Sequence, residues 1–239
     1  MSNIEKNCNL NKALELSSSM NLEKIYLDCF CYVKRILEKQ EICKSDFFIN
    51  RAIDIRALAR AYGVDVIEIN MKMNNEIFKH GTLGYLDYYC GKWTIYVNEA
   101  MGDLTKRYII AHELGHYFLE FDNDVSKIEY YKNPLFPKSC EEQICDIMAS
   151  FLLMSIETVF EIMQEYVKKN VKGGIDMYEW LNHLGYELGV SDYHTVGCFQ
   201  NVRYLAGFIY EKKGDYIYHG SNRECKAVYE KMLTCPTLF

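Results

Sequence analysis

The segment from His112 to His116, which reads His-Glu-Leu-Gly-His, constrains this chain most, because apolar residues flank it on both sides. Tyr108 to Ala111 precede it, and Tyr117 to Leu119 follow it. A helix of this composition belongs in a protein interior rather than on a solvated face. Helical residues four positions apart share one face, so His112 and His116 can direct two imidazoles at one ion. Because buried imidazoles need polar partners, we predict a bound metal ion.

The chemistry of the motif depends on Glu113, which lies beside the two histidines. Its carboxylate could reach a water molecule on zinc without binding the ion itself. Zinc lowers the pKa of its bound water to about 7, and Glu113 would take the proton as the water attacks a polarised carbonyl. Gly115 costs about 1 kcal/mol of helix propensity, so we expect another element to approach closely there. The alternative is a chance occurrence of a short pattern among ordinary helix residues.

A catalytic zinc site requires a third protein ligand and one position left for water, and no third histidine follows the motif at short spacing. The helix predicted to begin near residue 140 places Glu142 and Asp146 one turn apart. We predict Glu142 as the third ligand, with Glu141 or Glu129 as alternatives. Glu141 is otherwise interpreted as a solvated acid at a helix N-terminus. Asp146 has apolar neighbours, so we expect it to be buried and to bond a metal-binding histidine.

The remaining pattern indicates an α+β fold with a small mixed or antiparallel sheet before the motif. Gln143 to Met163 is about as long as a membrane span, but the acids within it favour a core helix. Periodicity and capping residues predict helices at 21–40, 52–62, 104–121, 140–168 and 177–188, and a short helix from 190–191. Runs of β-branched and aromatic residues predict strands at 64–69, 84–86, 93–98, 204–210 and 216–219.

Composition restricts the cellular setting and the partners. The 10 cysteines are irregularly spaced and the first residues form no apolar signal segment, so we expect reduced thiols in the cytoplasm. A net charge of -6 disfavours direct binding to nucleic acid. No contact with a membrane is expected.

The chain resembles the ImmA/IrrE family of zinc metallo-endopeptidases. The core of that family reads as an arginine-led apolar stretch, HELGH, and a later helix with the pattern E-x-x-A-[ND]-x-F-A-x-x-L-L-M-P. Arg107 to His116 and Glu142 to Ser155 correspond to these parts, and the likeness spans roughly residues 50–195. The later helix matches at Glu142, Asp146, Ala149, Leu152, Leu153 and Met154, while Cys145, Met148 and Ser155 replace the usual alanine, phenylalanine and proline.

This resemblance implies a zincin-like fold of the gluzincin type, in which a small sheet packs on the HExxH helix and a second helix carries the third ligand. It implies one zinc ion and a cytoplasmic endopeptidase that cleaves a partner helix-turn-helix repressor of a mobile element, prophage or stress regulon. We therefore expect an N-terminal helical lead-in at 1–45, a metallopeptidase core at 46–190 and a C-terminal α/β extension at 191–239.

Two further predictions concern the substrate. Trp93 to Asn98 is a candidate edge strand for binding the substrate backbone. Tyr193 or His194 could stabilise an oxyanion, although structural roles are favoured for both.

Two other functions stay open. The protein could be a non-catalytic zinc-containing module that binds a regulator, as an anti-repressor or a sensor; a fourth protein ligand would then close the zinc site. A DNA-binding regulator would depend on the helix-turn-helix-like stretch from Leu181 to Phe199, which lacks a clear basic recognition helix.

Overall fold

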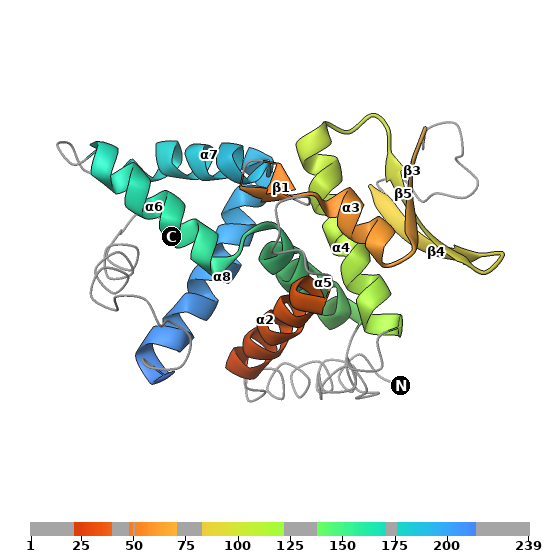
Figure 1. Ribbon diagram of the computed structural model, residues 1–239, viewed down its shortest axis with the longest axis horizontal. Helices are drawn as coiled ribbons and strands as arrows, with labels where there is room; N and C mark the ends of the chain where they lie inside the picture. The colour runs from red at the N-terminus through yellow and green to blue at the C-terminus, as the bar shows by residue number, and fades with distance from the viewer. Residues whose placement is uncertain are drawn as a thin grey trace, which may run out of the picture.

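Helices and a small sheet form a mixed α+β structure, as predicted. The computed structural model describes residues 22–39, 48–49, 51–70, 83–121, 138–170 and 176–213. Its helices are α2 (Leu22–Lys39), α3 (Ile55–Ala61), α4 (Asp103–Phe121), α5 (Lys138–Leu153), α6 (Ile156–Asn170), α7 (Met177–Leu188) and α8 (Asp192–Lys213). Its strands are β1 (Phe48–Ile49), β2 (Ala52–Ile53), β3 (Val64–Ile69), β4 (Gly84–Tyr89) and β5 (Lys92–Asn98). Figure 1 shows the longer strands at one end of the molecule and α6, α7 and α8 at the other.

The three longer strands form a mixed sheet in the order β3-β5-β4. Strand β3 runs parallel to β5, whereas β4 runs antiparallel to it. The β4–β5 hairpin turns at Cys90 and Gly91, whose φ angles of 51° and 81° suit a two-residue hairpin turn. The strands predicted at 84–86 and 93–98 are therefore confirmed, and they form an antiparallel hairpin. The prediction of Trp93 to Asn98 as an edge strand is wrong, because β5 is paired on both sides and β4 lies at the edge beside it.

Helix α4 packs between the sheet and helix α5 (Figure 1). On the sheet side, Gly84 leaves room for Ile109, whose side chain would collide with a Cβ at that position. On the other side, a Cβ on Gly115 would lie 3.1 Å from the Cα of Cys145 in α5. The close approach expected at Gly115 is confirmed, and the two glycines allow α4 to be enclosed on opposite sides.

Helix α3 begins later than predicted, because Ala52 and Ile53 pair with β1 as a short strand. The helix starts after Asp54, whose carboxylate accepts hydrogen bonds from the backbone N–H groups of Arg56 and Ala57 at 3.1 and 3.0 Å. This is N-capping, which satisfies amide groups that have no partner within the helix.

Arg107 connects helix α4, which contains the HELGH segment, to two segments that are distant in the sequence. Its Nε donates to the carbonyl of Gly189 and its Nη2 to the carbonyl of Ile53, each at 2.8 Å. Gly189 has a φ of 63° and ends helix α7 in the left-handed region. One guanidinium thus connects α4, β2 and the end of α7, as its several donors permit.

The single helix predicted at 140–168 is wrong, because α5 and α6 are separate helices bent by 54°. The Oγ of Ser155 accepts a hydrogen bond from the backbone N–H of Thr158 at 3.1 Å, which starts α6. The apolar side chains of this region are buried in the core, as expected for Gln143 to Met163. Within the described residues, no single helix has both the length and the apolar character needed to cross a membrane; only the bent pair α5 and α6 passes that test together.

The strand predicted at 204–210 is also wrong, because these residues belong to helix α8. The segment follows a helical period, since Cys198, Val202 and Leu205 are all buried. Helix α8 packs against α5. The strand predicted at 216–219 lies outside the described residues, and the proposed domain boundaries stay predictions. The cysteines within the described residues, Cys29, Cys31, Cys90, Cys145 and Cys198, form no disulfide.

Candidate metal centre

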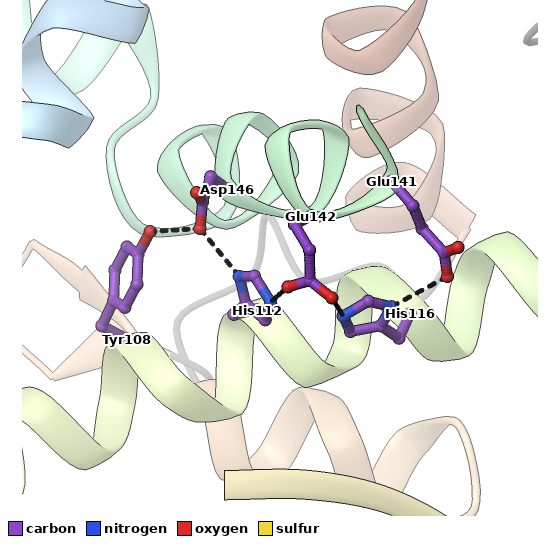
Figure 2. Close-up of polar contacts among 6 residues, drawn as sticks. All are labelled: Tyr108, His112, His116, Glu141, Glu142 and Asp146. Atoms are coloured by element: carbon purple, nitrogen blue, oxygen red, sulfur yellow. Dashed lines mark hydrogen bonds and ion pairs between the residues drawn. The ribbon is translucent and has the colours of Figure 1, made fainter. Parts of the chain in front are cut away.

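The two motif histidines and Glu142 form a compact group between α4 and α5 (Figure 2). The Nε2 atom of His112 lies 3.1 Å from Glu142 Oε2, and that of His116 lies 3.6 Å from Glu142 Oε1. One ligand atom from each residue lies within 4.8 Å of the other two. In the described part of the chain, this group could hold a metal ion.

The Nδ1 atom of each imidazole contacts a further carboxylate, a different one for each histidine. His112 Nδ1 lies 2.8 Å from Asp146 Oδ1, and His116 Nδ1 lies 3.2 Å from Glu141 Oε1 (Figure 2). Helix α5 supplies all three carboxylates, which meet the histidines of α4. Metal-binding histidines are commonly oriented in this way, so both Nε2 atoms are directed at Glu142.

The charges around His112 stabilise positive charge at this position. Burial lowers the pKa of His112, but the hydrogen bond and charge of Asp146, with the charges of Glu113 and Glu142, raise it above its ordinary value. Burial alone would raise the pKa of Asp146, but its bonds with His112 and Tyr108 lower it overall. The Asp146 side chain is 47% exposed, so the expectation that it is buried is wrong, although its expected contact with a histidine is present.

Glu113 lies beside this group and faces strand β4. Its carboxylate accepts a hydrogen bond from the backbone N–H of Leu86. Burial raises the pKa of Glu113 above its ordinary value, and the opposing effect of the two histidines is smaller. A cavity of about 360 Å³ opens here, lined by Gly84, Tyr85, Leu86, Trp93, His112, Glu113, His116, Glu120 and Glu142.

The donor set fits a zinc ion by chemistry and by spacing. Two imidazole nitrogens and one carboxylate oxygen are a ligand set of catalytic zinc sites. Donors at tetrahedral positions with bonds of about 2.0 to 2.2 Å lie about 3.4 Å apart. The separations of 3.1 and 3.6 Å between the imidazole nitrogens and Glu142 lie close to this value.

Comparison with known families agrees with this geometry. The family described as the IrrE N-terminal-like domain, Peptidase M78, matches residues 59–191, which is more than half of the chain and includes all three residues of the candidate metal centre. The chain belongs to this family. No curated protein matches it in sequence. Membership in the IrrE N-terminal-like family confirms the resemblance found in the sequence and indicates a metallopeptidase.

Two contacts in this member of the IrrE N-terminal-like family were missed by the sequence analysis. Glu141, interpreted as a solvated acid or an alternative ligand, holds His116. The hydroxyl of Tyr108 donates to Asp146 Oδ1 at 2.8 Å. Tyr108 could have been found from its spacing, because it lies one helical turn before His112 on the same face.

The other candidate residues lie away from the cavity or outside the described chain. Tyr193 and His194 are not among the residues that line the cavity. Tyr193 is 87% exposed, and His194 stacks on the ring of Tyr108 with centroids 3.9 Å apart. Their role as oxyanion stabilisers stays a prediction. Glu129 lies outside the described residues.

Proposed function

We propose that this protein is a zinc-dependent endopeptidase with a zincin-like, gluzincin-type fold. The observation that carries the proposal is the convergence of His112, His116 and Glu142, with Glu113 beside them in the same cavity. His112 and His116 would hold the ion from α4, and Glu142 would hold it from α5. When bound, zinc polarises the scissile carbonyl and acidifies the attacking water.

Glu113 is the general base in this proposal. Its carboxylate takes a proton from the attacking water and passes it to the leaving amine. The hydrogen bond from the N–H of Leu86 fixes the carboxylate in the cavity.

Strand β4, rather than β5, is the proposed binding edge for the substrate backbone. It is paired with β5 on one side, and its residues Gly84 to Leu86 line the cavity that contains Glu113. An extended peptide could add to this edge by main-chain hydrogen bonds. Methylation of the peptide nitrogens that flank the scissile bond should then slow cleavage, and unchanged cleavage would argue against this binding mode.

The proposed substrate is a partner helix-turn-helix repressor of a mobile element, prophage or stress regulon, as the family resemblance implies. The proposed setting is the cytoplasm. A non-catalytic zinc module is less well supported, because the metal-binding group has three members in the described chain and a cavity adjoins it.

The Glu113→Gln variant tests the proposed function. Wild-type and variant proteins, both loaded with zinc, are incubated with purified helix-turn-helix repressors as candidate substrates and with denatured casein, and cleavage is measured by mass spectrometry. We expect the variant to keep its zinc and lose cleavage by at least about a hundredfold. Glu161→Gln, which changes a glutamate on the exposed side of α6, should cleave like the wild type. Cleavage by a folded, zinc-loaded Glu113→Gln protein would exclude Glu113 as the base.

A further inference from the structure

Asp146 is held by more than its contact with His112. The Nδ1 atom of His112 and the hydroxyl of Tyr108 both approach the same oxygen, Asp146 Oδ1, at 2.8 Å (Figure 2). The Asp146 side chain is 47% exposed, so packing alone does not restrict its rotation. The Tyr108 hydroxyl therefore contributes directly to the position of the oxygen that orients His112.

Tyr108 is in turn held by the first turn of α8. The ring of His194 stacks on Tyr108 with centroids 3.9 Å apart and an angle of 18° between the planes. His194 Nδ1 lies 2.7 Å from the Oγ of Ser191, just before the helix. A continuous chain of contacts thus runs from Ser191 through His194, Tyr108 and Asp146 to His112.

The chemistry of Tyr108 suits the role of a fixed donor. Burial, and then the charge of Asp146, raise the pKa of its phenol, so the hydroxyl keeps its proton. A protonated phenol donates to the carboxylate, and hydrogen bonds to ionised acceptors are among the stronger ones in proteins. The carboxylate in turn accepts the Nδ1 proton of His112, which leaves Nε2 free to bind a metal ion.

We propose that Tyr108 is a positioning residue for the metal site and that His194 holds Tyr108 in place, so the start of helix α8 supports the orientation of His112. This inference rests on the proposed zinc site. It assigns His194 a role through stacking and not through contact with the substrate. It also gives the α7–α8 junction an effect on metal affinity although this junction does not line the cavity.

The experiment compares zinc affinities by competition with a chelator, and the visible spectra of the cobalt-substituted proteins. Tyr108→Phe removes one hydroxyl and leaves the stacked ring. We expect zinc binding to be about threefold to tenfold weaker and the cobalt spectrum to change. This loss of affinity is smaller than the loss expected when a residue that directly contacts a metal ligand is removed. His194→Ala should weaken binding similarly, whereas His194→Phe, which keeps a stacking ring, should restore it.

Tyr117→Phe is the matched control, because the Tyr117 hydroxyl on the same helix donates to the carbonyl of Tyr62 and not to the metal site. It should bind zinc like the wild type, even if its metal-free form loses as much stability as Tyr108→Phe. Wild-type affinity and cobalt spectrum in Tyr108→Phe would overturn the proposal, as would equal losses in His194→Phe and His194→Ala. If Tyr108→Phe does not fold, the comparison of His194→Ala with His194→Phe tests the proposal. A wild-type protein that binds no zinc would refute the proposed function itself and this inference with it.

Discussion

Gly115 and Cys145 mark a close contact of helices α4 and α5, because a Cβ on Gly115 would lie 3.1 Å from the Cα of Cys145. The contact is with helix backbone, which cannot rotate aside as the end of a side chain can. Helix α4 carries the two histidines and α5 carries Glu142. The spacing that this glycine permits therefore determines how closely the imidazole nitrogens of His112 and His116 approach the Glu142 carboxylate.

Gly115→Ala should separate the two helices slightly and weaken zinc binding. The alanine gains about 1 kcal/mol in helix propensity, but overpacking costs about 1 to 3 kcal/mol. We expect a free energy of unfolding up to about 2 kcal/mol lower and zinc affinity at least about tenfold weaker. Urea unfolding of the metal-free protein and chelator competition measure the two effects.

Gly197→Ala is the control for that substitution. Gly197 also lies within a helix, α8, but an added Cβ would meet nothing within 4 Å. It should raise the free energy of unfolding by up to about 1 kcal/mol and leave zinc binding unchanged. Equal zinc affinities in Gly115→Ala and Gly197→Ala would show that the helix spacing does not control the site.

Substitutions of the neighbouring acids Glu142 and Glu141 should distinguish the proposed metal ligand from the residue that orients His116. Glu142→Ala removes the proposed ligand, and we expect zinc affinity to fall by more than about a hundredfold. Glu141→Gln keeps an oxygen near His116 Nδ1, so a loss of about tenfold or less is expected. Isothermal titration with zinc measures both. A larger loss of zinc affinity in Glu141→Gln than in Glu142→Ala would indicate that Glu141 is the ligand and Glu142 the residue that orients a histidine.

Glu68→Gln should reveal a pH-dependent contribution to stability outside the metal site. Glu68 accepts a hydrogen bond from Lys106 Nζ at 2.5 Å, and that bond, followed by the charge of Arg56, lowers its pKa below the ordinary value of 4.5. A lowered pKa stabilises the folded state above pH 4.5, and this contribution is lost as the pH falls through the lowered value. The variant should be less stable at pH 7, and the difference from the wild type should shrink in acid.

Urea unfolding between pH 3 and pH 7 measures that difference, with roughly one-unit steps across the expected transition. Lys106 is buried, so loss of the Glu68 charge should lower the free energy of unfolding, although Glu68 itself is partly exposed. A difference that is constant with pH would mean that the Glu68 charge does not stabilise the fold.

Features that depend on local periodicity could be predicted from the sequence. The spacing of His112 and His116 places both on one helical face, and the turn at Cys90 and Gly91 specifies a hairpin. Gly115 indicated a close approach, because its cost in helix propensity needs a structural reason. These signals arise within a few residues of each other, so no knowledge of the fold is needed to interpret them.

Sequence reasoning failed where a distant segment decides the outcome. The central position of β5 results from its pairing with β3. The alternation of apolar and polar residues along each strand does not specify which strand becomes its neighbour. Residues 204–210 continue helix α8, which packs against α5, although aromatic and β-branched residues there suggested a strand.

The sequence by itself determined that two imidazoles and the carboxylate of Glu113 would share one helix, because helical geometry fixes the positions of residues four apart. Only the tertiary structure decided which carboxylate meets which nitrogen. Glu141, Glu142 and Asp146 are chemically alike, and their contacts depend on the docking of α5 against α4. The contact of Tyr108 with His194 likewise joins residues far apart in the chain, which no local pattern specifies.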